Sequence, residues 1–309
     1  MNTPFSHSST AAVIEGPAEH ASSRLATKKA PNAPIAYPRD FLDNRFVYLT
    51  ISPRAHGLSI GVNLNPDRKC NFDCVYCEVD RRSKVQEVDL DCDLAGAELE
   101  RTLARVHGSG LKQRVPYAAL APELLRLRHV ALSGDGEPTA SPQFLHAVET
   151  VVHIRALGLF PFFKIVLITN ASHLDRPEVR EGLLLFTKQD EIWAKLEAGT
   201  QEYMDFINRP SVPLEKILSN ILLTAKERPV IIQSLFTRVG DRAPGIAEIE
   251  QYALRLRELK DAGARIPLVQ IYSATRPSSS STVQHLPLRV MSQIAETVRR
   301  IAGLPTEVF

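Results

Sequence analysis

The stretch CNFDCVYC, residues 70–77, places three cysteines within eight residues in a CxxxCxxC spacing, with Tyr76 directly before the last of them. A loop this short can aim the thiols of Cys70, Cys74 and Cys77 at one centre, but it cannot easily supply a fourth ligand. Cysteine thiolates hold iron–sulfur clusters, normally with one thiolate on each iron. Three thiolates on a four-iron cluster would leave one iron open, and an open position distinguishes a reactive metal site from a structural one. The stretch therefore predicts a reactive metal centre.

The composition is that of an ordinary soluble globular protein. Of the 309 residues, 44% are hydrophobic and 23% are charged, and the net charge is +2. This charge gives no strong electrostatic argument for a nucleic-acid partner, although it does not exclude one. No apolar run approaches the roughly 18 residues that span a membrane, and the N-terminus has no signal-peptide core. Clustered thiols that serve as ligands predict a reducing cytoplasmic location, with no membrane partner.

The pattern along the chain predicts an α/β fold. Residues 1–34 are rich in Ser, Ala and Pro and predict a disordered tail, which leaves one domain over residues 35–309. A short N-terminal hairpin opens this domain. Six strands separated by helical patterns follow, at residues 58–64, 129–133, 164–168, 191–197, 230–236 and 268–272. Such strands make parallel βαβ units, and six are too few for a closed eight-stranded barrel, so we predict an open, partial (β/α)6 parallel barrel.

Helices are predicted where apolar residues recur at helical spacing. They cover residues 94–106, 116–125, 142–157, 214–225 and 246–262, with a C-terminal helix over 288–301. In parallel α/β folds the functional residues lie at the C-terminal ends of the strands. Polar clusters follow the predicted strands at the cysteine loop, at residues 134–139, at 169–170, at 195–197 and at 233–234, and also at 272–276. We therefore expect these clusters to meet at one mouth of the barrel.

With these motifs in place, the chain resembles the radical S-adenosylmethionine (SAM) superfamily. Its CxxxCxΦC loop, in which Φ is aromatic, is matched by Cys70, Cys74, Tyr76 and Cys77. The resemblance implies a [4Fe-4S] cluster on the three cysteines, with SAM chelating the open iron. It also implies that an external electron donor of flavodoxin or ferredoxin type drives cleavage of SAM to methionine and a 5′-deoxyadenosyl radical. That radical would abstract hydrogen from a substrate.

The same resemblance implies SAM contacts at the strand ends. The glycine-rich stretch at 134–137 would approach the methionine moiety, with Glu137 accepting a hydrogen bond from its ammonium group. Thr169 and Asn170 after the third strand would contact ribose. Glu197 in the fourth strand, or alternatively Lys195, would help to hold SAM, and Ile271 of the last strand would pack on adenine. In chain order the expected cofactor-binding residues are Tyr76, Gly134, Asp135, Gly136, Glu137, Thr169, Asn170, Lys195, Glu197 and Ile271.

Within the superfamily, the chain resembles the branch of wyosine-base synthases, which modify tRNA. Residues 58–64, 136–139 and 276–277 carry this likeness. The chain departs from the branch because no cysteine precedes Cys70 to hold a second cluster, and the flavodoxin-like domain of eukaryotic members is missing. The reaction of that branch is therefore not transferred. An RNA base remains one expected substrate class, and a peptide or protein is the alternative.

Purely structural roles for the same residues remain alternatives. With Cys92, the fourth cysteine, the loop could form a structural zinc site in a non-enzymatic RNA-binding module, whose basic stretch at 101–128 would contact RNA. Cys92 could equally be an incidental buried thiol. Glu137 could cap the helix that follows it, and the pair Thr169 and Asn170 could form a turn.

Overall fold

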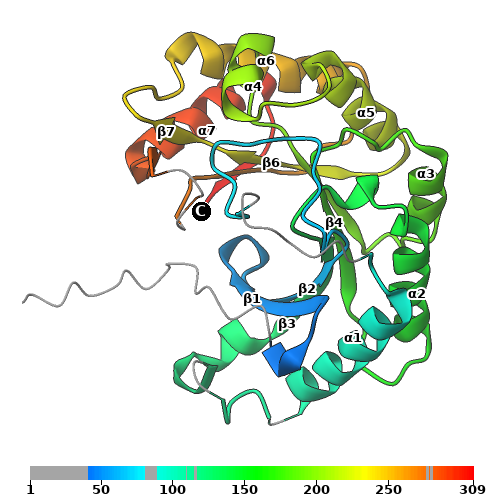
Figure 1. The fold of residues 1–309 in the computed structure, drawn as a ribbon. Coiled ribbons are helices and arrows are strands. Elements are labelled where there is room, and N and C mark those ends of the chain that lie inside the picture. The colour runs from blue at the N-terminus through cyan, green and yellow to red at the C-terminus, as the bar shows by residue number, and fades with distance from the viewer. Residues whose placement is uncertain (1–40, 81–88, 109, 115–116, 276–277, 279–280) are drawn as a thin grey trace, which may run out of the picture. The chain divides into compact units, whose positions relative to one another are not determined.

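One curled sheet organises the part of the chain that the computed structural model describes, residues 41–80, 89–108, 110–114, 117–275, 278 and 281–309 (Figure 1). The tail expected over residues 1–34 lies outside the described residues, as do residues 276–277. The strand order is β1-β2-β3-β4-β5-β6-β8-β10. The strands are β1 Val47–Ser52, β2 Gly57–Asn63, β3 Leu127–Ser133, β4 Lys164–Thr169, β5 Glu191–Lys195, β6 Val230–Leu235, β8 Val269–Tyr272 and β10 Thr306–Val308.

The predicted partial (β/α)6 barrel is confirmed. The six strands predicted from the sequence, β2, β3, β4, β5, β6 and β8, pair in parallel and in chain order. The expected hairpin adds β1 antiparallel to β2 at one edge of the sheet. At the other edge β10 pairs in parallel with β8, which the sequence did not predict because three residues are too short to show a pattern.

Seven helices accompany the strands in the described residues: α1 Cys92–His107, α2 Phe144–Ala156, α3 Pro177–Leu184, α4 Gln201–Ile207, α5 Leu214–Glu227, α6 Ile246–Asp261 and α7 Leu288–Ala302. Most of them lie along the outer face of the curled sheet (Figure 1). A separate pair of short strands, β7 Thr237–Val239 and β9 Val283–His285, is antiparallel. None of the described helices is long and apolar enough to cross a membrane.

The helix predicted over residues 116–125 is wrong. The described part of this segment forms two 3-10 turns, Tyr117–Ala119 and Pro122–Leu125. Pro122 opens the second turn, and a proline cannot continue a preceding helix because it lacks the N–H donor and its ring clashes with the upstream carbonyl. The helix expected from residue 142 begins two residues later, at Phe144.

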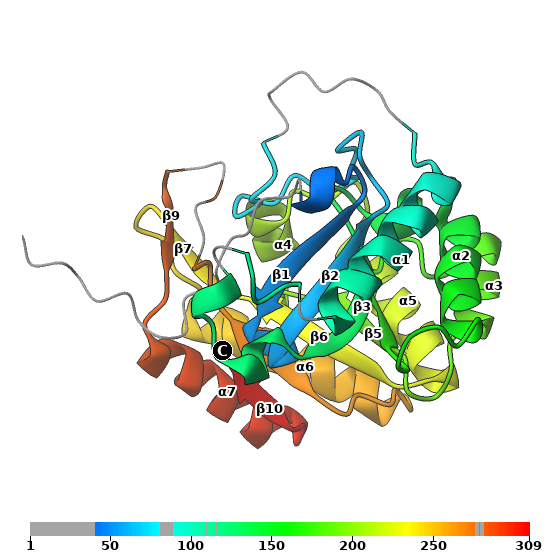
Figure 2. The same cartoon turned by 90° about the horizontal axis from the view of Figure 1, so that it is seen from below.

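The turn between β1 and β2 reaches the opposite edge of the sheet. The His56 ring lies 5.7 Å from the ring of Phe309, and its Nε2 lies 3.5 Å from Glu307 Oε1. Figure 2 shows the end of the chain beside this hairpin. Because β1 and β10 are the two outermost strands, these contacts bring the free edges of the curled sheet together at this level.

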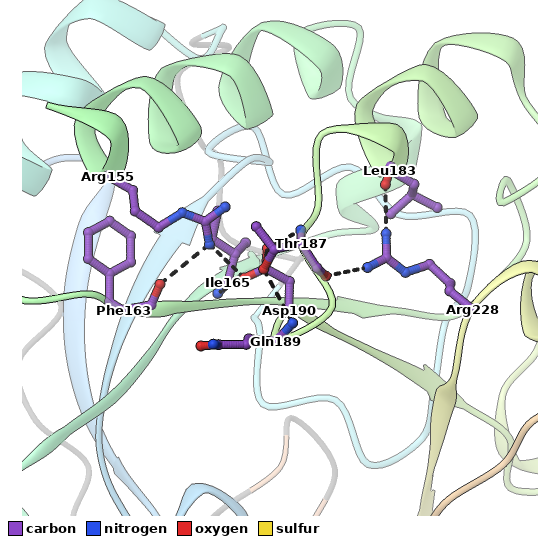
Figure 3. Close-up of polar contacts among 8 residues, drawn as sticks. All are labelled: Arg155, Phe163, Ile165, Leu183, Thr187, Gln189, Asp190 and Arg228. Carbon is purple, nitrogen blue, oxygen red and sulfur yellow. Dashed lines mark hydrogen bonds and ion pairs between the residues drawn. The ribbon is translucent and has the colours of Figure 1, made fainter. Parts of the chain in front are cut away.

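A buried carboxylate fastens the N-terminal ends of β4 and β5 to the helical layer (Figure 3). Asp190 directly precedes β5 and accepts hydrogen bonds from Arg155 of α2, from the backbone of Ile165 in β4, and from the backbone and hydroxyl of Thr187. The ion pair of Arg155 and Asp190 is 2.7 Å long, and the two side chains are 8% and 0% exposed. Nearby, Arg228 donates to the backbone carbonyl of Leu183 in α3 and to that of Thr187 in the loop before β5.

We expect Asp190→Ala to lower the free energy of unfolding by about 3–5 kcal/mol, because Arg155 would remain charged, buried and unpaired. A matched control is Glu227→Ala, which breaks the largely exposed pair with Arg180. This change should lower the free energy by about 0–1 kcal/mol. Urea titration of both variants measures the difference, and equal losses would contradict the structural role given to Asp190.

Candidate functional site

A cavity of about 310 Å³ opens at the C-terminal ends of the parallel strands. The cysteine loop, the turn at 134–137 after β3, and the last residues of β4, β5, β6 and β8 line it. Of the residues predicted from the sequence, it brings together Cys70, Cys74, Tyr76, Cys77, Gly134, Asp135, Gly136, Glu137, Thr169, Asn170, Lys195 and Glu197. Residues that are far apart in the chain thus form one site.

Ile271 does not reach this cavity. Side chains alternate between the two faces of a strand. In β8, Gln270 hydrogen-bonds to Gln233 on the inner face, and Tyr272 on the same face lines the cavity. Ile271 therefore lies on the outer face, where it is fully buried. The adenine-packing role expected for Ile271 has no support in this geometry.

The cysteine loop is held by the segment that follows α4. The backbone N–H of Asp73 donates to the carbonyl of Asn208 at 3.1 Å, and the N–H of Val75 donates to the carbonyl of Ile207 at 3.0 Å. The N–H of Ser211 donates back to the carbonyl of Asn71 at 3.0 Å. These bonds fix the backbone of the loop independently of its cysteines.

Asn208 is a site residue that the sequence analysis missed. Its Nδ2 lies 3.0 Å from the hydroxyl of Tyr76, 3.0 Å from Glu197 Oε2 and 3.5 Å from the sulfur of Cys74. A side-chain amide has two hydrogens to share among these three acceptors. No local pattern in the sequence marks Asn208, because two of its three contacts are with residues of the cysteine loop more than a hundred positions away.

The glycines at 134 and 136 are required by close backbone approach. A Cβ on Gly136 would lie 1.8 Å from the carbonyl oxygen of Lys69, just before the first cysteine. A Cβ on Gly134 would lie 2.5 Å from Asn63 Oδ1. In both cases the added Cβ would overlap atoms of the protein itself. The glycines therefore let the turn pack directly against the cysteine loop and the end of β2.

Glu137 joins the end of β3 to the end of β4. Its buried carboxylate accepts hydrogen bonds from the backbone and hydroxyl of Thr139, from the hydroxyl of Thr169 and from the backbone of Asn170. Burial raises the pKa of Glu137, while these four donors favour the charged form. The capping alternative is met in part, since Glu137 caps the 3-10 turn Pro138–Ala140 and not α2. The four bonds commit the carboxylate to the protein.

The side chain of Asn170 also binds the cysteine loop. Its Nδ2 donates to Asn71 Oδ1 at 2.9 Å, and Asn71 Nδ2 donates to the hydroxyl of Ser172 at 2.9 Å. Thr169 accepts from the backbone of Ala171 in the turn that follows β4. The polar pair expected at the ribose thus shapes a turn and holds the loop, while lining the cavity.

Lys195, which is half-buried, and Glu197, which is buried, form an ion pair between two aromatic rings. Lys195 Nζ lies 2.7 Å from Glu197 Oε1, 3.2 Å from the hydroxyl of Tyr272 and 5.1 Å from the centre of the Tyr76 ring. Burial alone would lower the pKa of Lys195, but the neighbouring Glu197 and Tyr272 raise it above its ordinary value. Lys195 therefore stays charged near neutral pH.

The three thiols fit a cluster better than a single ion. Burial, together with the charge of Glu197, raises the pKa of Cys74 to about 12, so metal coordination must displace its proton. In a cluster each thiolate binds a different iron, so the thiols need not converge on one point. Within the described residues no three His, Cys, Asp or Glu side chains are placed to hold a single metal ion.

Cys92 lies elsewhere. It is the first residue of α1, is buried, and lines a small separate space with Val62 and Leu99. It does not line the cavity of the cysteine loop. The four-cysteine zinc site considered from the sequence therefore lacks its fourth ligand.

The model of the family described as the Radical SAM superfamily matches residues 64–253 of the chain. Among curated proteins, UPF0026 protein MJ1312 of Methanocaldococcus jannaschii is 27% identical over 174 residues, which cover 56% of this chain and 47% of that protein. The chain thus spans about half the length of this curated relative.

Two solved structures resemble the fold. SuiB of Streptococcus suis bound to precursor peptide SuiA superposes with a TM-score of 0.57 at 12% identity, covering 82% of this chain and 49% of SuiB. TYW1 with a lysine–pyruvate adduct, from the wyosine synthase branch, gives a TM-score of 0.52 at 17% identity and covers 80% of this chain and 74% of TYW1. At such identities the likeness concerns the fold alone.

We expect Gly136→Ala to displace the cysteine loop, because the new Cβ would overlap the carbonyl of Lys69. Overpacking of this kind typically lowers the free energy of unfolding by about 1–3 kcal/mol. Gly245→Ala is the control, since a Cβ there meets nothing within 4 Å and its φ of −75° suits any residue. Urea titration and analysis of bound iron would compare the variants, and a wild-type result for Gly136→Ala would refute the close approach.

Proposed function

Because the chain belongs to the radical SAM superfamily and is an enzyme, we propose that it holds one [4Fe-4S] cluster and cleaves SAM reductively. The observation that carries the proposal is that the three cysteines and the turn at 134–137 line one cavity at the strand ends. When bound, the cluster would supply the electron that cleaves SAM to methionine and the 5′-deoxyadenosyl radical. The radical would then abstract hydrogen from the substrate.

In this proposal Cys70, Cys74 and Cys77 hold the cluster, and the other residues shape the space beside it. Gly136 and Asn170 keep the cysteine loop against the ends of β3 and β4. The cavity-lining residues expected to contact SAM are Tyr76, Gly134, Asp135, Gly136, Glu137, Thr169, Asn170, Lys195 and Glu197. Since the Glu137 carboxylate is committed to protein donors, backbone groups of its turn are the better partners for the SAM ammonium.

The ion pair of half-buried Lys195 with buried Glu197 would help to keep water from the reacting centre. Both charges are satisfied within the protein, together with Tyr272 and Asn208, so neither requires solvent. Excluding water protects a reactive intermediate from side reactions. The electron would come from an external flavodoxin- or ferredoxin-type donor, and a reducing cytoplasm would keep the three thiols available as ligands.

The substrate is proposed by class only. The resemblance to the wyosine-base synthases favours an RNA base. The alternative is a peptide, and SuiB, which shares the fold, has been solved with its precursor peptide bound. Comparison of modified nucleosides and of the metabolome between a deletion strain and its parent decides between the classes. Loss of a modified nucleoside supports RNA, and unchanged nucleosides contradict it.

We expect Cys77→Ala to abolish both the cluster and SAM cleavage, because it removes one of three iron ligands. The wild-type chain, reconstituted anaerobically with iron and sulfide, should bind about four irons and release 5′-deoxyadenosine when given SAM and dithionite. Cys92→Ala should retain the iron and the cleavage, since Cys92 lies outside the cavity. A reconstituted wild type that fails to cleave SAM would refute the proposed function.

A further inference from the structure

Part of the cavity wall is formed by residues to which the proposed function assigns no contact with SAM. They come from the β1–β2 turn and from the ends of β6 and β8, and they are Ser52, Pro53, Arg54, Gln233, Leu235 and Tyr272. Among these six, Arg54 carries a permanent charge.

Arg54 faces the cavity without a partner for its charge. Its guanidinium carbon lies 4.0 Å from the centre of the Tyr272 ring, a stacking contact that orients the planar group but leaves its donors available. Within the described part of the chain, the buried Nε of Arg54 has no hydrogen-bond partner, and no carboxylate forms an ion pair with the guanidinium. Arg54 as a whole is half-buried, and a buried donor without a partner is costly, so the guanidinium fits an anionic ligand.

Two acidic side chains of the barrel interior are committed to other residues. Glu197 pairs with Lys195 at 2.7 Å, and Glu191 pairs with Lys164 and accepts from the indole of Trp193. Since each of these carboxylates is bound to another residue, neither neutralises Arg54.

The charge of Arg54 is felt inside the barrel. Burial, followed by the charges of Lys164 and Arg54, lowers the pKa of His129 to about 3. His129 is therefore neutral near pH 7 and does not add to the positive charge. The interior beside Arg54 thus favours a negative group.

Arg54 lies away from the cysteine loop. Tyr76, which precedes Cys77, is 5.1 Å from Lys195 Nζ, measured to the ring centre. Lys195 is in turn 5.7 Å from the ring of Tyr272, and Arg54 stacks on that ring. Arg54 precedes β2 and the cysteine loop follows it, so the two lie at opposite ends of that strand, with two aromatic rings and a lysine between them.

The turn that carries Arg54 is firmly held. It is the 3-10 turn Pro53–Ala55, and the hydroxyl of Ser52 caps it by accepting from the backbone of Ala55 at 3.3 Å. On its far side His56 contacts Glu307 and Phe309 at the opposite edge of the sheet. A guanidinium on a pinned turn can bind with little loss of conformational freedom.

We infer that Arg54 binds a carboxylate or phosphate group of the substrate, at the end of the cavity remote from the cysteine loop. The statement that the anion belongs to a substrate rests on the proposed function. The anion site itself is argued from the residues of this chain alone. A planar guanidinium held by stacking presents parallel donors, which suit either oxyanion. The enzyme would therefore act on an acidic molecule, anchored by its negative group.

Isothermal titration calorimetry on the full chain tests this inference, with sodium acetate and inorganic phosphate as probes and ionic strength kept constant with sodium chloride. The titrations are run with and without the reconstituted cluster, and with and without saturating SAM. We expect saturable binding of at least one anion, with affinity that SAM does not reduce. Iron content is measured separately, so a missing cluster and a missing anion site are distinguishable.

Variants assign the binding to Arg54. Arg54→Met should weaken the anion at least tenfold, Arg54→Lys should restore part of the affinity because the charge remains, and Arg289→Met, on the exposed surface of α7, should bind as the wild type does. Circular dichroism verifies that each variant is folded.

Each outcome of the titrations decides the inference. Binding of acetate alone assigns a substrate carboxylate, binding of phosphate alone assigns a substrate phosphate, and binding of both assigns an anion site that does not discriminate. Loss of anion binding in the presence of SAM would overturn the inference, because Arg54 would then contact the SAM carboxylate. Absence of saturable binding, or unchanged binding in folded Arg54→Met, would overturn it as well.

Discussion

The buried carboxylate of Glu137 is the interaction on which the candidate site depends. A buried carboxylate is stable only when donors surround it, and Glu137 finds its donors on two different strand ends. This requirement fixes the distance between the ends of β3 and β4. The glycine turn beside Glu137 is then positioned to receive the backbone of the cysteine loop at Gly136. The position of the cysteine loop thus depends in part on how one acidic group is satisfied, beside the bonds that the loop makes with the residues after α4.

The same device recurs around the barrel. Glu98 of α1 is 1% exposed and accepts three successive backbone N–H groups where β1 begins. Glu248 of α6 accepts from the backbone of Gly199 and Thr200 after β5. Asp190 accepts from Arg155 and from the backbone of Ile165 at the N-terminal ends of β4 and β5. In each case a helix or loop carboxylate satisfies backbone donors that the sheet ladder leaves over, and so ties one layer to the next.

Features that repeat along the chain, or that depend only on neighbouring residues, could be predicted from the sequence. Six strands and their helices show hydrophobic periodicity, and the spacing of Cys70, Cys74 and Cys77 is local, so both could be predicted. The edge strand β10 is too short for periodicity to be visible. Asn208 depends on distant partners, and Arg54 sits in an ordinary turn whose approach to Tyr272 appears only when the sheet curls. Strand alternation could have excluded Ile271, since the polar neighbours on either side of it already occupy the inner face.

The contact of His56 with Glu307 and Phe309 has a consequence for the order in which the barrel is completed during synthesis. The partners are roughly 250 positions apart, so the hairpin leaves the ribosome long before the strand edge that it meets. At ordinary elongation rates the delay is roughly 10–50 s. Contacts of such separation close late, because chain entropy opposes them until the rest of the sheet exists. The contact of Arg54 with Tyr272, which also joins distant parts of the chain, is therefore expected to form late as well.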